Sequence, residues 1–171
     1  MRLFIGLEPP SEVRKALAVQ TQWLHALLGG KRMFDSNLHL TLAFLGETSP
    51  QAVQRLRKLL AAAPNTPFTL KIDLAGDFNR GGVVWLGCGD MPPALAALSD
   101  AIRQGLADNG ITFDSKPLAP HITVLRKSQS IRASLTQPID WPVDKVVLYV
   151  SESTPAGVVY RPLFQEALTQ T

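Results

Sequence analysis

The chain has 171 residues, which is enough for one ordinary domain with a substantial hydrophobic core. Hydrophobic residues make up 46% of the chain and charged residues 18%, a balance that excludes a disordered chain. No apolar run approaches the roughly 18 residues that a membrane-spanning helix needs. The formal net charge of +3 comes without a block of Lys and Arg, so it suits an anionic substrate without identifying one.

Two features indicate the compartment. The single cysteine, Cys88, excludes an internal disulfide and fits a reducing cytoplasm. The apolar stretch at residues 2–7 ends at once in Glu8-Pro9-Pro10, and it lacks the longer apolar region and the cleavage site of a signal peptide. We therefore interpret this stretch as a first strand and expect a cytoplasmic protein without membrane association.

Strand-like and helix-like segments alternate along the chain. Apolar residues at helical spacing predict helices over residues 10–28, 49–62 and 92–109. The expected buried side of the first helix consists of Val13, Leu17, Leu24, Leu27 and Leu28. Apolar runs bounded by turn residues predict strands over residues 2–8, 38–45, 68–76, 83–89, 121–125, 144–152 and 158–165. We expect a short helix near Ile131–Leu135, in the polar connection after the fifth strand.

One short pattern occurs twice, on two of these predicted strands. His39-Leu40-Thr41-Leu42 returns almost unchanged as His121-Ile122-Thr123-Val124. Because successive side chains point to opposite faces of a strand, the imidazole and the hydroxyl share one face in each copy. A buried strand face that carries polar side chains must satisfy them or present them to a ligand. Two matched copies therefore predict one site built from two halves.

The two copies lie close to half the chain length apart, and no Pro/Gly/Ser-rich linker or low-complexity tract separates them. We therefore expect a single domain over residues 1–171 with two lobes. Each lobe is expected to be an α+β unit that contributes one His-x-Thr strand to a shared cleft.

The paired residues suit chemistry at phosphorus. Histidine titrates near pH 6.5, so a neutral imidazole can accept a proton from an attacking hydroxyl or water while a cationic one gives a proton to the departing oxygen. Thr41 and Thr123 place hydroxyls where they can contact non-bridging phosphate oxygens, and Arg126 adds a cation just after the second motif. Phe4 lies on a strand that borders the cleft, where it either stacks on a base or packs in the core.

The sequence also resembles a known family. NLHLTLAFLGE and KPLAPHITVLR are similar to the paired signatures of the two-histidine (2H) phosphoesterases, specifically the bacterial and archaeal RNA 2′,3′-cyclic phosphodiesterases, also called 2′-5′ RNA ligases. The resemblance extends over nearly the whole chain, from RLFIGLEPP through VVWLG to LYVSESTPAGVVYRPL. It implies an α+β fold with a bilobal pair of mainly antiparallel sheets, outer helices, pseudo-two-fold symmetry and an active site in the central groove.

The resemblance further implies an enzyme that hydrolyses RNA 2′,3′-cyclic phosphate ends to 2′-phosphomonoesters, with reverse 2′-5′ RNA ligation as a second activity. His39 becomes the proton donor to the leaving 3′-oxygen, and His121 the proton acceptor that activates water. Thr41, Thr123 and Arg126 become phosphate contacts. No cofactor or metal is implied, the partner is an RNA or oligonucleotide with a cyclic phosphate end, and we expect a monomer. The residues themselves leave the acid and base assignment open, because a near-symmetric site works in either direction.

Two alternatives remain beside this interpretation. A zinc site needs three or four ligands, yet Glu47 lies eight residues from His39 and Asp114 seven residues before His121, so we expect no metal. A non-catalytic RNA-end or nucleotide-binding module would be expected to lack a motif histidine, and both are present. His25, on the first predicted helix, has no motif around it, and we expect it at the surface.

Overall fold

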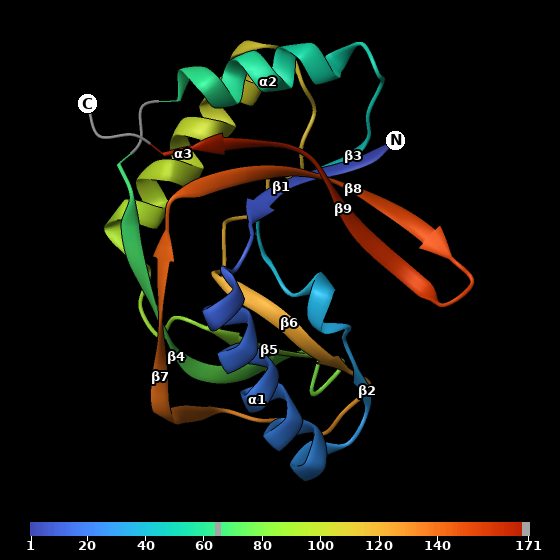
Figure 1. Cartoon of the computed structure of the whole chain (residues 1–171), viewed down its shortest axis with the longest axis vertical. Coiled ribbons are helices and arrows are strands. Elements are labelled where there is room, and N and C mark those ends of the chain that lie inside the picture. The colour runs from blue at the N-terminus through green and yellow to red at the C-terminus, as the bar shows by residue number, and fades with distance from the viewer. Residues whose placement is uncertain (64–65, 169–171) are drawn as a thin grey trace.

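The computed structural model describes residues 1–63 and 66–168, which form the α+β fold expected from the sequence (Figure 1). The helices are α1 (Ser11–Leu28), α2 (Ala52–Ala62) and α3 (Pro93–Asp108), with a short 3₁₀ turn, η1, at Asp35–Asn37. The strands are β1 (Arg2–Leu7), β2 (Lys31–Arg32), β3 (Leu40–Glu47), β4 (Phe68–Phe78), β5 (Val83–Gly87), β6 (His121–Arg126), β7 (Ala133–Val143), β8 (Lys145–Thr154) and β9 (Gly157–Ala167). None of the helices in the described ranges combines the length and the apolar character that crossing a bilayer requires.

The strands form two antiparallel sheets that correspond strand for strand. One sheet has the order β3-β1-β8-β9, and the other has the order β2-β6-β5-β4-β7. Apart from the two-residue strand β2, each sheet thus starts at a His-x-Thr strand and adds three antiparallel neighbours. This equivalence is the pseudo-two-fold relationship that the family resemblance implies, and it assigns one motif to each lobe.

The lobes are not the two halves of the chain. Strands β4 and β5 precede the second motif and join its sheet, whereas β8 and β9 come from the C-terminal part and complete the sheet of the first motif. Only Asp144 separates β7 from β8, so the chain passes directly from one sheet to the other at this point. Each sheet is therefore built by pairing between segments that lie far apart in the sequence.

The helices cover the outer faces of the sheets. Helix α1 packs against β6 and β7, while α3 packs against β3 and α2 against β9, at the other end of the molecule (Figure 1). The buried face of α1 includes Val13, Leu17, Leu24 and Leu28, as expected. Leu27 was expected on this face and is instead 69% exposed, because its position on the helix points away from the sheet. Burying a leucine side chain, as at Leu17 and Leu24, contributes about 1.5–3 kcal/mol to the stability of the fold.

The segment near Ile131–Leu135 is not a helix, contrary to the prediction. The 11-residue strand β7 (Ala133–Val143) begins there and pairs with β4. Pro138 and Pro142 lie within β7, and a proline in a strand interior usually argues against a strand because it cannot donate to a neighbour. Strand β7 is at the edge of its sheet, where one side of the backbone needs no partner, so both prolines are tolerated.

Candidate active site

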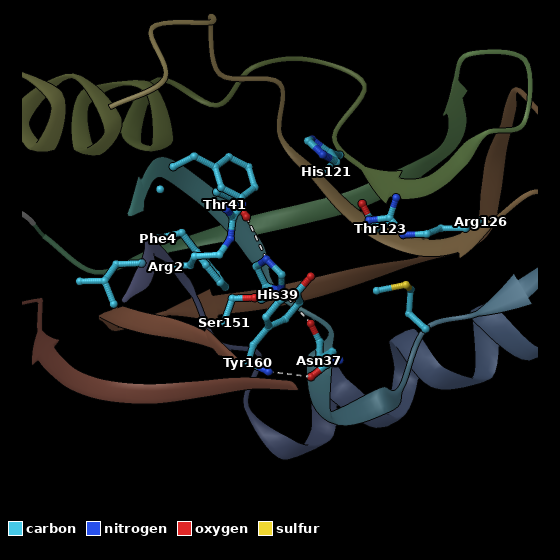
Figure 2. Close-up of a pocket in the computed structure, with 14 residues that line it drawn as sticks. Arg2, Phe4, Asn37, His39, Thr41, His121, Thr123, Arg126, Ser151 and Tyr160 are labelled. Carbon is cyan, nitrogen blue, oxygen red and sulfur yellow. Dashed lines mark hydrogen bonds between the residues drawn. The ribbon is translucent and has the colours of Figure 1, made fainter. Parts of the chain in front are cut away.

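The two motifs place their polar side chains as strand alternation predicts. Leu40 and Ile122 are fully buried in the core, while His39, Thr41, His121 and Thr123 are half-buried on the opposite face. His39 lies one residue before β3, and His121 is the first residue of β6. Because β3 and β6 belong to different sheets, the two imidazoles reach the space between the lobes from opposite sides (Figure 2).

A cavity of about 190 Å³ lies between the two motifs. All four motif residues line it, and Arg126 closes one side. Its remaining walls come mainly from the first lobe, namely from Arg2, Leu3, Phe4, Met33, Asn37, Phe44, Gly46, Ser151 and Tyr160. Apart from the half-buried histidines, the cavity offers hydroxyls and guanidinium groups, which are hydrogen-bond donors suited to a phosphate group.

Both imidazoles are held by the same kind of backbone contact. The Nδ1 atom of His39 lies 2.7 Å from the carbonyl oxygen of Asn37, and the Nδ1 atom of His121 lies 2.5 Å from that of Ala119. A carbonyl oxygen only accepts, so each ring carries a proton on Nδ1. The Nε2 atom of each ring is therefore the one that gains or loses a proton during a reaction.

His39 lies in an enclosed part of the cavity. Its Nε2 atom is hydrogen-bonded to Oγ1 of Thr41 at 2.8 Å. Its ring centroid lies 4.7 Å from that of Phe4 and 4.9 Å from that of Tyr160. Burial lowers the pKa of His39 from 6.5 to about 4, although the hydrogen bond to the Asn37 carbonyl opposes this shift. Without a ligand, His39 is therefore neutral at pH 7.

His121 has a different environment. Its ring meets the ring of Phe78 edge to face at 5.1 Å, and the ring of Trp85 lies 6.5 Å away. Within residues 1–63 and 66–168, no protein group is hydrogen-bonded to its Nε2 atom, and Thr123 makes no bond comparable to the one between Thr41 and His39. The Nε2 atom of His121 is thus available to a ligand or to water.

The sequence model of the 2′-5′ RNA ligase superfamily matches residues 9–155. The chain belongs to this superfamily. A protein of Escherichia coli K12 named RNA 2′,3′-cyclic phosphodiesterase is 34% identical over 99% of the chain and 97% of its own length. A Thermotoga maritima protein of the same name is 31% identical over 96% of the chain and 94% of its own length. The resemblance to the two-histidine phosphoesterases is thereby confirmed.

Two solved structures share the fold of this chain. E. coli LigT complexed with 3′-AMP superposes with a TM-score of 0.85 at 34% identity, covering 99% of this chain and 98% of that one. The protein TT0787 of Thermus thermophilus also reaches a TM-score of 0.85, at 28% identity and 99% coverage of both chains. The bilobal α+β fold expected from the sequence is confirmed by these matches.

The two remaining predicted site residues differ in exposure. Arg126 is exposed and lines the cavity, as a phosphate contact requires. Phe4 is only 3% exposed, and its ring stacks on Tyr149 at 4.8 Å while contacting His39. This placement favours packing behind the imidazole over stacking on a base.

Asn37 is a site residue that the sequence analysis missed. Its side chain is buried, donates from Nδ2 to the carbonyl of Val158 at 2.8 Å, and accepts from the backbone N–H of Tyr160 at 3.1 Å. It thereby connects η1 to β9 while its own carbonyl holds His39. No local pattern reveals this role, because the partners follow more than 120 residues later.

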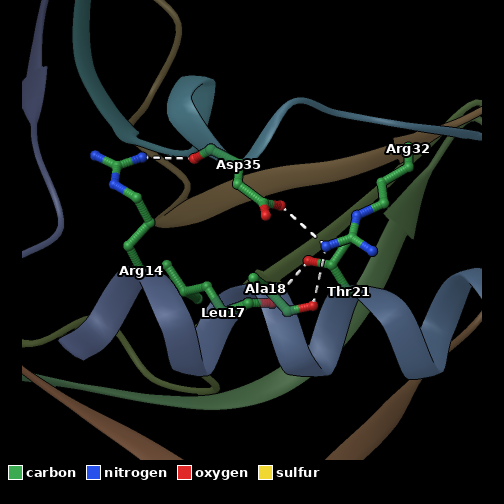
Figure 3. A network of polar contacts seen from close by, with 6 residues as sticks. All are labelled: Arg14, Leu17, Ala18, Thr21, Arg32 and Asp35. Carbon is green, nitrogen blue, oxygen red and sulfur yellow. Dashed lines mark hydrogen bonds and ion pairs between the residues drawn. The ribbon is translucent and has the colours of Figure 1, made fainter. Parts of the chain in front are cut away.

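Helix α1 fixes the segment that leads into the first motif (Figure 3). Arg14 donates to the carbonyl oxygens of Asp35 at 2.6 Å and Leu38 at 3.2 Å. Arg32 donates to the Asp35 carboxylate at 3.0 Å and to the Ala18 carbonyl at 3.3 Å. These bonds join α1, β2 and η1, so the backbone on both sides of Asn37 is held in place and His39 is oriented with it.

In the described part of the chain, no three His, Cys, Asp or Glu side chains come together in a group that could hold a metal ion. His25 is exposed on α1, hydrogen-bonded to the carbonyl of Gly30, and does not line the cavity. It therefore offers a histidine outside the site for comparison with His39 and His121.

Proposed function

We propose that the chain hydrolyses 2′,3′-cyclic phosphates at RNA ends to 2′-phosphomonoesters by acid–base catalysis between His39 and His121. The observation that carries this function is the pair of imidazoles facing one cavity from opposite sheets, each with Nδ1 held by a carbonyl. The superfamily membership and the names of the full-length relatives support the same substrate.

In this reaction His121 accepts a proton from water as the water oxygen attacks phosphorus. The bond between phosphorus and the 3′-oxygen breaks, and His39 gives its proton to that oxygen. Thr41, Thr123 and Arg126 contact the non-bridging oxygens and stabilise the charge that develops on them. The reverse reaction joins a 5′-hydroxyl to the cyclic end through a 2′-5′ linkage, since the acid and the base exchange roles on reversal.

The low pKa of His39 has a consequence for this assignment. The Nε2 atom of a neutral His39 has no proton to donate, so His39 must take up a proton from the solvent when the substrate binds. The cyclic phosphate carries a negative charge, and an anion beside a buried imidazole favours its protonated form. We therefore infer that substrate binding raises the pKa of His39 and completes the acid–base pair.

We further propose that the protein acts as a monomer, in the cytoplasm, and on RNA ends without a metal or cofactor. The lone cysteine supports the reducing compartment. The chemistry of the site supports catalysis without a metal or cofactor, because two imidazoles and neighbouring hydrogen-bond donors supply every proton transfer and charge contact that the hydrolysis needs.

The test is an assay with EDTA on a short RNA ending in a 2′,3′-cyclic phosphate. Wild type should form the 2′-phosphate, and His39→Ala and His121→Ala should each lose about 10²–10⁴-fold in rate. His25→Ala is the matched control, because it removes the third histidine from an exposed helix position. If folded wild type binds the RNA without turnover, the non-catalytic binding module is the correct interpretation.

A further inference from the structure

Helices α1 and α3 each contribute one half-buried arginine, Arg14 and Arg103, whose hydrogen bonds go to backbone carbonyls. Within the described residues, neither guanidinium is in an ion pair, and Nε of Arg103 is buried without a hydrogen-bond partner. Keeping a half-buried cation without a counter-ion costs stability. This cost points to a role for the backbone segments that the two side chains hold.

Arg14 holds the first motif from a helix that packs on the other lobe. Helix α1 packs against β6 and β7, which belong to the sheet of the second motif. From there Arg14 donates to the carbonyl oxygen of Asp35 at 2.6 Å (Figure 3) and to that of Leu38 at 3.2 Å. Leu38 directly precedes His39, so the position of this imidazole depends on a helix of the second lobe.

Arg103 makes the reciprocal contact. Helix α3 packs against β3, in the sheet of the first motif. The Nη2 atom of Arg103 donates to the carbonyl of Leu42 on β3 at 3.1 Å, and its Nη1 atom donates to that of Lys116 at 2.7 Å. Lys116 lies five residues before His121, in the segment that leads into β6. Arg103 and His121 also line a second cavity, of about 380 Å³, beside the central one.

The connection from Lys116 to the second histidine is short and stiff. Two of its four residues, Pro117 and Pro120, have a φ angle fixed by the proline ring. A third, Ala119, supplies the carbonyl that holds Nδ1 of His121. A displacement of the Lys116 carbonyl is therefore transmitted to the imidazole, because the residues between them have little freedom to absorb it.

We propose that Arg14 and Arg103 are positioning residues that set the separation of the two imidazoles, each holding one motif from a helix of the opposite lobe. This assignment rests on the proposed function, in which both rings act on one phosphorus atom. A displacement of about 1 Å at a reacting group costs about 10²-fold in rate. Loss of either guanidinium should therefore lower kcat by about ten-fold to a hundred-fold. KM should stay within about two-fold, because the phosphate contacts remain.

Two substrates test each arginine through the histidine that it holds. One is a short RNA ending in a 2′,3′-cyclic phosphate, and the other has sulfur in place of the 3′-bridging oxygen, so that its thiolate departs without a proton. Arg14→Met should lose about ten-fold or more on the oxygen substrate but less than about three-fold on the sulfur substrate, as expected for a displaced proton donor. Arg103→Met should lose about ten-fold or more on both, as expected for a displaced proton acceptor.

Double variants test whether the arginines act through the imidazoles. Arg103→Met combined with His121→Ala should be no slower than His121→Ala alone, and the same should hold for Arg14→Met combined with His39→Ala. A general loss of structure would instead add to the histidine effect. All kinetics are compared between preparations that are folded by circular dichroism.

Arg55→Met is the matched control. Arg55 on α2 also donates to a backbone carbonyl, that of Asn109, but this bond lies at the end of α3 and outside both motifs. Its rates on both substrates should equal those of wild type. Where a methionine variant of Arg14 or Arg103 does not fold, the glutamine variant takes its place, because glutamine keeps a hydrogen-bond donor on a side chain too short to bond both carbonyls.

The histidine variants separate two kinds of failure. If wild type does not open the cyclic phosphate, or if His39→Ala and His121→Ala keep its rate, the proposed function has failed. If the histidine variants lose activity but the folded arginine variants do not, the arginines do not position the imidazoles and the proposed function stands. The same conclusion follows if an arginine variant does not share the substrate pattern of its histidine, or if its loss adds to that of the histidine variant.

Discussion

The His39 side and the His121 side of the cavity share a motif but differ in their surroundings. His39 is bonded to Thr41 and enclosed by rings of the first lobe, whereas His121 keeps a free Nε2 atom at the junction of two cavities within the described part of the chain. Both rings have the same backbone anchor on Nδ1. The motif thus fixes where each imidazole lies and which nitrogen reacts, while the residues around it decide how readily that nitrogen holds a proton.

The largest expected effect tests whether His39 is the general acid and His121 the general base. In a cyclic phosphate whose 3′-bridging oxygen is replaced by sulfur, the departing thiolate needs no proton, since thiols have a pKa of about 8.5. His39→Ala should then lose less than about ten-fold in rate, against about 10²–10⁴-fold on the oxygen substrate. His121→Ala should lose about 10²–10⁴-fold on both substrates. The opposite pattern would exchange the two roles.

The second prediction concerns Asn37, whose side chain binds the segment before the first motif to β9. Asn37→Ala leaves the Val158 carbonyl and the Tyr160 N–H without their partner, which should lower the free energy of unfolding by about 2–4 kcal/mol. Because Asn37 also carries the carbonyl that holds His39, kcat should fall with little change in KM. Urea unfolding and steady-state kinetics measure both effects.

Asn109→Ala is the matched control for this variant. Asn109 is exposed at the end of α3 and makes one side-chain bond, to the Gly105 carbonyl, so its loss should cost under about 1 kcal/mol. Equal destabilisation by the two substitutions would show that Asn37 is not an anchor of the first motif.

The third prediction follows from the lowered pKa of His39. The unfolded chain binds a proton at this residue near pH 6.5, but the folded protein does so only near pH 4, so the unfolded state holds more protons between these values. The stability due to a neutral His39 is complete above pH 6.5 and is lost as the pH falls through 4. Between pH 7 and pH 4, the free energy of unfolding of wild type should fall by up to about 3 kcal/mol more than that of His39→Asn.

Denaturant titrations at several pH values measure this difference, and His25→Asn should follow wild type. Parallel curves for wild type and His39→Asn would mean that His39 is solvated in the folded state. Added inorganic phosphate should shift the His39 titration, followed by NMR, toward higher pH. If phosphate leaves the His39 titration unchanged, the inference that an anion in the cavity raises the pKa of His39 is wrong.

The sequence allows prediction of those features that depend on local pattern. Alternation along a strand is enough to place His39 with Thr41 and His121 with Thr123, and duplication is enough to predict two lobes. Strand β7 is not predicted, because Pro138 and Pro142 argue against a strand in this segment. The structure tolerates both prolines because β7 lies at the edge of its sheet.

Features that depend on distant pairing are not predictable in this way. The exchange of strands between the halves of the chain, and the contact of Asn37 with β9, arise from segments far apart in the sequence. The same holds for the enclosure of His39, because one of its neighbours, Tyr160, comes from the C-terminal hairpin. The chemical difference between the histidines is thus a property of the tertiary structure.

The smallest expected effect is a difference between the two threonines. Thr41→Val and Thr123→Val remove one hydroxyl each while nearly keeping the side-chain shape. A hydrogen bond to a charged group contributes about 1.5–3 kcal/mol, so losing a phosphate contact should lower kcat/KM by about ten-fold or more in each variant. Thr41→Val additionally removes the bond to Nε2 of His39. Its rate should therefore fall several-fold further, and it alone should alter the NMR titration of His39. Equal losses, with His39 unchanged in both variants, would mean that Thr41 acts on the phosphate alone and that the two sides of the site are chemically equivalent.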